Sequence, residues 1–244
     1  MKFGVIVALA LTFLRSKMKE SARWENAKKQ RDYNAIAPNW KTLLQPKYLK
    51  SLLFLIGMYG FWNLWAGTNG FFFPYILRTV GSQSQAMAVT LQAGGFFLSM
   101  LSIYFVFMKF ADKISQRLLF GISAIMQIIG MSLLAIFPLT LPVAMIHIFL
   151  MQFGGGFGAQ SFFQLWSSEQ FPTEVRATAQ GAAFAVVRIG LGIFAFFVPW
   201  LTATGFTTLA WILVGFLVVS GAIGLFWAPR NEGLSLEEIE NRTN

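Results

Sequence analysis

Cysteine is absent from the 244-residue sequence, and histidine occurs once. Without thiols the chain has no disulfide, no thiolate nucleophile and no cysteine ligand for a metal. Its long apolar runs contain no acidic residue, and it has no GxSxG motif. Neither a metal site nor a nucleophile with its base can be assembled from these residues, so we predict that the protein is not an enzyme and has no cofactor.

Charged residues are also scarce, at 12% of the chain, whereas apolar residues make up 56%. Soluble chains carry about 25% charged residues. The net charge is +9, but all ten acidic residues and most of the basic ones fall in short segments between apolar runs. Charges in that pattern flank membrane spans rather than bind nucleic acid, so the lipid bilayer is the expected partner.

Six apolar runs are long enough to cross a bilayer as helices, because about 20 residues span its hydrocarbon core. They cover residues 50–77, 86–108, 117–138, 141–166, 178–201 and 206–228. The sequence therefore predicts an all-α, polytopic membrane protein with a six-helix transmembrane domain at residues 50–228.

A shorter apolar run occupies residues 3–14. It is too short to span a bilayer unaided, and no small-residue cleavage site follows it, which argues against a signal peptide. We interpret residues 1–14 as the end of a transmembrane helix whose beginning lies outside this chain. A signal anchor is the alternative.

Lysine and arginine are distributed unevenly between the loops, which predicts the orientation of the spans. Residues 15–50 contain ten basic residues, whereas the three turns expected on the opposite side contain one, Arg78. We expect a cytoplasmic loop at 15–49, a cytoplasmic tail at 229–244 and a location in the cell membrane. For residues 15–45, a solvated connector and a surface helix on anionic lipid are both open.

Four loop segments carry recognisable motifs. KESARW at 19–24 is similar to PESPRW, and DKISQR at 112–117 is similar to D-K/R-x-G-R-K/R with Ser115 at the glycine. SEQFP at 168–172, with an arginine four residues later, is similar to SEIFPxxxR, and residues 229–239 are similar to PETKGxSLEEI. In this order the motifs resemble those of the sugar porter family of the major facilitator superfamily. The resemblance implies the C-terminal half of such a carrier, from the end of span six to span twelve.

This resemblance implies secondary active transport of a small polar solute by alternating access. A sugar or an inositol-like polyol, carried together with protons, is the expected substrate. A separate N-terminal half or a second copy of the chain is an expected partner, because one half does not enclose a central path. An organic-anion carrier and a non-transporting fragment or accessory subunit are the alternatives.

The same resemblance implies a gate at the cytoplasmic ends of the spans. In the family, the glutamate of SEIFP pairs with basic residues of the inner loops when the carrier is open outward, and the pairs separate when it opens inward. By this pattern the expected gating residues are Asp112, Arg117, Glu169 and Arg176, which act through a two-state set of charge contacts.

Polar residues inside the spans are the candidates for substrate binding. In the seventh span the family has QQxxGxN, and residues 63–69 retain the glycine and Asn69, with Asn63 as a further polar group. Gly57, Gly60, Gly67 and Gly70 are expected to loosen that helix. In the tenth span Gln152, Gly156, Gln160 and Gln164 recur every four residues and share one helical face. We predict that Gln160 and Gln164 line the path; close packing through the neighbouring glycines is the alternative.

Arg188 is the one charged residue expected near the middle of the bilayer. It lies 12 residues beyond Arg176, or about 18 Å along a helix. A guanidinium at that depth costs about 2.5–3.5 kcal/mol unless it faces a partner or a wet cavity. Arg188 is therefore predicted to bind the substrate or couple protons, with bonding to helix carbonyls as the alternative. Gln92 and Gln127 are expected to bond between helices, and His147 to be packed.

Overall fold

The computed structural model describes residues 12–13 and 40–229. The chain divides into two units, Met1–Pro38 and Asn39–Asn244, and the description below concerns the second. Our predictions for residues 1–11, 14–39 and 230–244 lie outside the described residues. They include the KESARW motif and nearly all of the closing motif.

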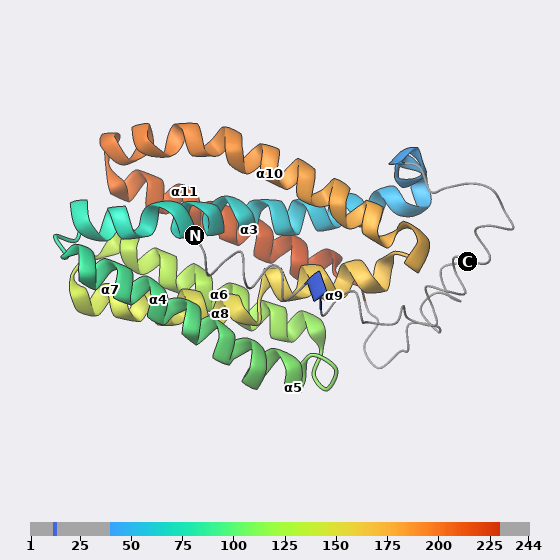
Figure 1. Ribbon diagram of the computed structural model, residues 1–244, viewed down its shortest axis with the longest axis horizontal. Coiled ribbons are helices and arrows are strands. Elements are labelled where there is room, and N and C mark those ends of the chain that lie inside the picture. Colours follow the sequence, from blue (N-terminus) through green and yellow to red (C-terminus); the bar gives the residue numbers. More distant parts are fainter. Residues whose placement is uncertain (1–11, 14–39, 230–244) are drawn as a thin grey trace, which may run out of the picture. The chain divides into compact units, whose positions relative to one another are not determined.

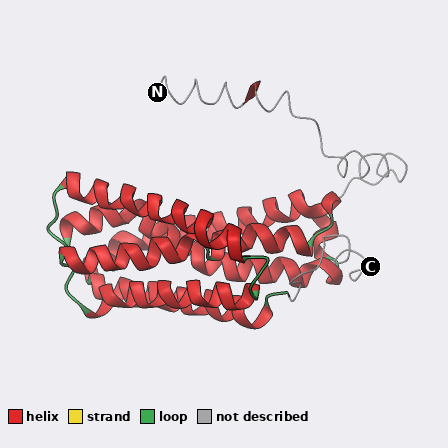
Figure 2. Cartoon of the chain, turned by 90° about the horizontal axis from the view of Figure 1, so that it is seen from below, coloured by secondary structure: helices red, strands yellow, loops and turns green. Residues whose placement is uncertain are grey.

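Helices make up nearly all of residues 40–229, and no strand occurs among them (Figure 1). The elements are η1 (Trp40–Leu44), α3 (Pro46–Thr79), α4 (Gln85–Ser102), η2 (Ile103–Phe107), α5 (Met108–Phe110), α6 (Gln116–Ile136), α7 (Leu141–Ile148), η3 (Phe149–Phe153), α8 (Gly154–Gly156), α9 (Ala159–Gln170), α10 (Thr173–Thr204) and α11 (Phe206–Trp227). The long helices lie side by side along their lengths, which gives an all-α bundle (Figure 2). The predicted fold class is confirmed.

Five helical segments of the described residues are long and apolar enough to cross a membrane. They are Gln85–Phe110, Gln116–Ile136, Leu141–Gln170, Thr173–Ala203 and Phe206–Trp227. Helix α3 has 34 residues but is not among the five, and its interior includes the polar residues Asn63 and Asn69. That α3 is the sixth span therefore stays a prediction.

Helix α10 begins earlier than the sequence predicts. We placed its start at residue 178 because Glu174 and Arg176 are charged, but the helix starts at Thr173 and includes both. An acidic side chain in the first turn is favourable, because it faces the positive end of the helix dipole. The charges thus cap the span instead of preceding it.

Helix α3 is central to the bundle, in contact with α4, α9, α10 and α11 (Figure 1). Its first half packs into an apolar cluster around Tyr59, Phe163 and Trp166, all at most 1% exposed. Its second half packs into a cluster that contains Leu77 and Met151, which are fully buried. Helix α3 thereby joins the other helices into one body. The helix is continuous from Pro46 to Thr79, so its glycines do not break it.

The interruption lies instead in the span expected at residues 141–166. A π-helical stretch, Phe149–Phe153, follows α7, and the helix stops at Gly156 and restarts at Ala159. The expected four-residue periodicity of the glutamines therefore does not run along one continuous helix.

Serine hydroxyls satisfy the carbonyls that this interruption leaves free. Ser102 on α4 donates to the Phe153 carbonyl at 2.5 Å, and Ser123 on α6 donates to that of Gly154 at 2.7 Å. Ser161 donates to the Gly156 carbonyl, also at 2.7 Å. Irregular backbone is tolerated at membrane depth only when its polar groups are paired within the protein, so these serines stabilise the break.

Candidate functional site

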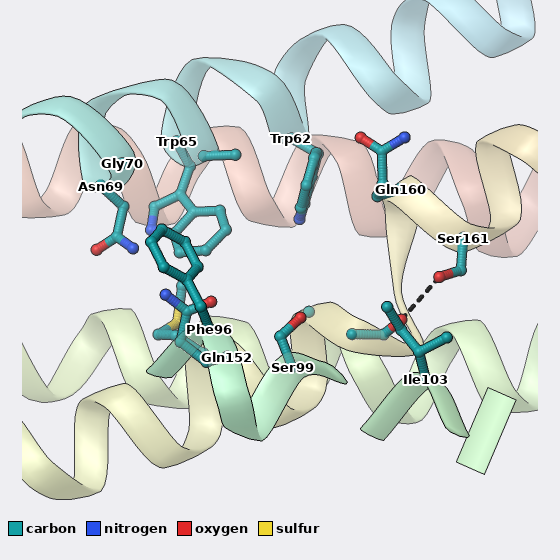
Figure 3. Close-up of a pocket in the computed structure, with 14 residues that line it drawn as sticks. Trp62, Trp65, Asn69, Gly70, Phe96, Ser99, Ile103, Gln152, Gln160 and Ser161 are labelled. Atoms are coloured by element: carbon teal, nitrogen blue, oxygen red, sulfur yellow. Dashed lines mark hydrogen bonds between the residues drawn. The ribbon is translucent and has the colours of Figure 1, made fainter. Parts of the chain in front are cut away.

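A cavity of about 210 Å³ lies beside this break, between α3, the α4–η2 segment and the η3–α9 segment (Figure 3). Its wall contains aromatic rings, amides, two serines and small residues. The lining residues are Trp62, Trp65, Ala66, Asn69, Gly70, Phe96, Ser99, Ile103, Met151, Gln152, Gly155, Gly156, Gln160 and Ser161. No charged side chain is among them.

Two of the predicted binding residues, Asn69 on α3 and Gln160 on α9, line this cavity (Figure 3). Gln160 Oε1 accepts a hydrogen bond of 2.6 Å from the Tyr59 hydroxyl, which fixes the amide and leaves its NH₂ group available. Gln152 is the third amide in the wall. It fits because Gly95 faces it: a Cβ there would lie 2.8 Å from Gln152 Cγ.

Aromatic rings form much of the remaining wall, and sequence reasoning missed them. Trp62 and Trp65 lie one turn apart on α3 and are tilted by 57°, with ring centroids 5.9 Å apart. Phe96 approaches from α4 (Figure 3). The spacing of Trp62, Trp65 and Asn69 places all three on one helical face, and this pattern could have indicated them.

The other three predicted binding residues are outside the cavity wall. Asn63 is 3% exposed and lies beside the Tyr59 hydroxyl. Arg188 is exposed on α10, and its charge interacts electrostatically with Tyr59. Gln164 is exposed, one turn beyond Gln160 on α9. The structure thus brings Asn63 and Arg188 together around Tyr59 and leaves Gln164 apart.

The four predicted gating residues lie at one end of the bundle, near the start of α6, the α9–α10 turn and the end of α11 (Figure 1). Glu169 Oε1 accepts a hydrogen bond of 3.0 Å from Gln116 Nε2. The Arg117 guanidinium donates to the Ala228 carbonyl, and Arg176 Nε donates to the Phe171 carbonyl at 3.2 Å. Asp112 is exposed in the turn before α6. Their contacts link α6 to α9 and to the end of α11.

Comparison with known proteins identifies the family. Residues 10–242 match the family described as Sugar (and other) transporter. The chain belongs to this sugar porter family of the major facilitator superfamily. The family membership that the loop motifs predict is therefore confirmed.

Two curated relatives match nearly the whole chain. The minor myo-inositol transporter IolF of Bacillus subtilis (strain 168) is 42% identical over 97% of this chain and 55% of its own length. The probable 4-methylmuconolactone transporter of Cupriavidus pinatubonensis is 28% identical over 97% of this chain and 54% of its own length. The chain thus spans about half the length of these relatives.

Solved structures of XylE share the fold. A double-tryptophan mutant of XylE aligns with 80% of this chain and 43% of its own, with a TM-score of 0.69 and 16% identity. The proton:xylose symporter XylE bound to 6-bromo-6-deoxy-D-glucose aligns with 79% of this chain and 42% of its own, with a TM-score of 0.66 and 20% identity. At these identities the likeness concerns the fold alone.

Gln116 is a further residue that sequence reasoning missed. Its side chain is 3% exposed, accepts a 2.6 Å hydrogen bond from Trp166 Nε1 and donates to Glu169. It occupies the fifth position of the 112–117 motif, where the sugar porter pattern has arginine. That departure could have indicated it: Glu169 here binds a neutral amide at the position of a cation.

Proposed function

We propose that this chain is part of a secondary active carrier for a sugar or an inositol-like polyol. The observation that carries the proposal is the uncharged cavity lined by Asn69, Gln152 and Gln160. Amides offer both donors and acceptors to hydroxyl groups, and aromatic faces pack against the apolar surface of a ring. The relative IolF, a minor myo-inositol transporter that is 42% identical to this chain, supports the same substrate class.

The size of the cavity also favours a small solute. Pockets for drug-sized ligands have volumes of about 300–1,000 Å³. A cavity of about 210 Å³ suits a single hydroxylated ring better than a larger molecule. The proposal therefore commits to a monosaccharide or a cyclitol.

Alternating access coupled to protons is the second part of the proposal. Gln116, Arg117 and Glu169 join α6 to α9 and to the end of α11 at one end of the bundle, which is an arrangement suited to a gate. We assign this end to the cytoplasm and the chain to the cell membrane. Proton coupling is supported by the shared fold with XylE, which is a proton:xylose symporter.

An organic-anion carrier is the second candidate, and Arg188 favours it. The residue is exposed on a span, and its charge interacts with Tyr59, which in turn binds the cavity residue Gln160. An anion bound near Tyr59 would pair with this guanidinium. The 28% identical relative, a probable 4-methylmuconolactone transporter, supports a substrate other than a sugar.

Uptake by the complete carrier in proteoliposomes tests these proposals. Labelled myo-inositol, xylose and succinate are each offered with an inward proton gradient and with the gradient collapsed by a protonophore. We expect gradient-dependent uptake of myo-inositol or xylose, which Gln160→Leu and Asn69→Leu reduce at least about tenfold because each removes hydrogen bonds to the substrate.

Uptake of succinate without either hydroxylated solute would establish the organic-anion candidate instead. Polyol uptake that is independent of the gradient would overturn proton coupling alone. Polyol uptake that is unaffected by both leucine substitutions would show that the substrate binds elsewhere.

A further inference from the structure

We propose that Gln127 on α6 is a positioning residue for substrate binding, because it holds Trp62 in the wall of the cavity. The inference rests on the proposed function, since it takes the cavity as the place where the transported solute binds. Gln127 does not line the cavity itself. It acts through its contact with Trp62, which does line the cavity.

A chain of hydrogen bonds connects Trp62 to the break in the α7–α9 segment. Trp62 Nε1 donates to Gln127 Oε1 at 2.8 Å, and Gln127 Nε2 donates to Ser123 Oγ at 3.0 Å. Ser123 in turn donates to the Gly154 carbonyl at 2.7 Å. Gln127 is 2% exposed and Ser123 is fully buried, so water does not compete for these bonds. Both ends of the Gln127 amide are used.

This bond sets the orientation of the Trp62 ring. An indole has a single N–H donor, so a bond at that atom fixes one edge of the ring. Tyr59 stacks against Trp62 with centroids 5.7 Å apart and an interplanar angle of 26°. With one edge bonded and one face covered, Trp62 presents a defined surface to the cavity.

The same amide also controls the opposite wall. A Cβ on Gly158 would collide with Ser123 Oγ and lie 3.0 Å from Gln127 Nε2. Gly158 immediately precedes α9, which carries Gln160. Gln127 therefore contacts both α3, through Trp62, and the start of α9, and it sets the spacing between an aromatic and an amide part of the site.

Trp65 provides a matched comparison within the same wall. It lies one turn from Trp62 and is 3% exposed, but its Nε1 has no hydrogen-bond partner among residues 40–229. Trp62→Phe removes the bond to Gln127 and keeps an aromatic ring. Trp65→Phe makes the same chemical change where no such bond exists.

The test is a double-mutant cycle on the KM of uptake by the complete carrier, with thermal stability in detergent measured in parallel. Gln127→Met and Trp62→Phe are each expected to raise KM about 3- to 10-fold, the value of one hydrogen bond between helices, with a smaller change in kcat. The double variant should be no worse than either single one. In the Trp65→Phe background, Gln127→Met should raise KM by the same factor as it does in the wild-type carrier.

The cycle uses whichever solute the wild-type carrier transports, so a wrong substrate assignment is detected before the variants are compared. If Gln127→Met raises KM equally with Trp62 present or replaced by phenylalanine, the residue acts only on helix packing and the inference is overturned. A loss of melting temperature or kcat with an unchanged KM would overturn it as well.

Discussion

Replacing Gln116 by methionine removes two hydrogen bonds at the proposed gate while nearly keeping the volume of the side chain. Gln116 joins the fully buried Trp166 to the half-buried Glu169, with bonds of 2.6 and 3.0 Å. Trp166 also packs against Phe54 on α3 and Phe120 on α6. The amide therefore ties the Glu169 carboxylate to the rigid aromatic core.

The two lost bonds have different consequences. The Trp166 N–H is left buried without a partner, which costs about 1–3 kcal/mol and lowers stability in every state of the carrier. Glu169 loses one donor but is only half buried, so water replaces part of the bond and about 1 kcal/mol remains. If this bond breaks when the gate opens, the equilibrium between closed and open gates shifts about fivefold toward open.

Two further substitutions at position 116 separate the effect of side-chain charge from the effect of side-chain length. Gln116→Asn keeps the amide but is one methylene shorter, so it cannot bond to both partners and should behave like Gln116→Met. Gln116→Arg places a guanidinium beside Glu169, and a charge-assisted bond is about twice as strong as a neutral one. This variant should hold the gate closed and slow turnover.

Labelling of an introduced cysteine measures the gate directly, because this chain has no cysteine of its own. Ser99→Cys places the reporter in the cavity wall. A membrane-impermeant maleimide added on the side of Glu169 should label it about fivefold faster in Gln116→Met and more slowly in Gln116→Arg. Equal labelling rates in all variants would refute the role of Gln116 in the gate.

The remaining predictions concern packing and charge. A Cβ at Gly156 would collide with the Ser99 carbonyl and Ser102, so Gly156→Ala should lower the melting temperature by the equivalent of about 1–3 kcal/mol. A Cβ at Gly215 meets open space, so Gly215→Ala should not lower the melting temperature. Equal losses of melting temperature in the two variants would contradict the packing argument. If Arg188 binds substrate or couples protons, Arg188→Ala and Arg188→Lys should both reduce uptake, Lys less; near-normal activity in both would exclude these roles.

Five of the six expected spans were predictable because hydropathy depends on composition alone. The break in the segment 141–170 was not predictable. Nothing local distinguishes the glycines at 154–158 from those that permit close helix packing. The break is stabilised by distant side chains, Ser102 on α4 and Ser123 on α6. A sequence pattern cannot reveal which carbonyl a serine 31 or 51 residues away will pair with.

The candidate site was predictable only in part for a similar reason. Asn69 was found through a motif and Gln160 through a polar stripe, and both line the cavity. Gln164 belongs to the same stripe, but one turn beyond Gln160 on α9 it is exposed outside the cavity. Trp62 and Trp65 were missed because tryptophan in an apolar run is indistinguishable from a packed side chain.

Polar residues in this bundle have two competing uses, and the competition decides which of them can bind a solute. Each backbone group that the break frees needs a partner inside the protein, which engages Ser102, Ser123 and Ser161. Gln127 is engaged by Trp62 and Ser123. Within residues 40–229, Asn69 and Gln152 bond to no other side chain or carbonyl, and they line the cavity. These two amides are therefore available to the hydroxyl groups of a solute in the cavity.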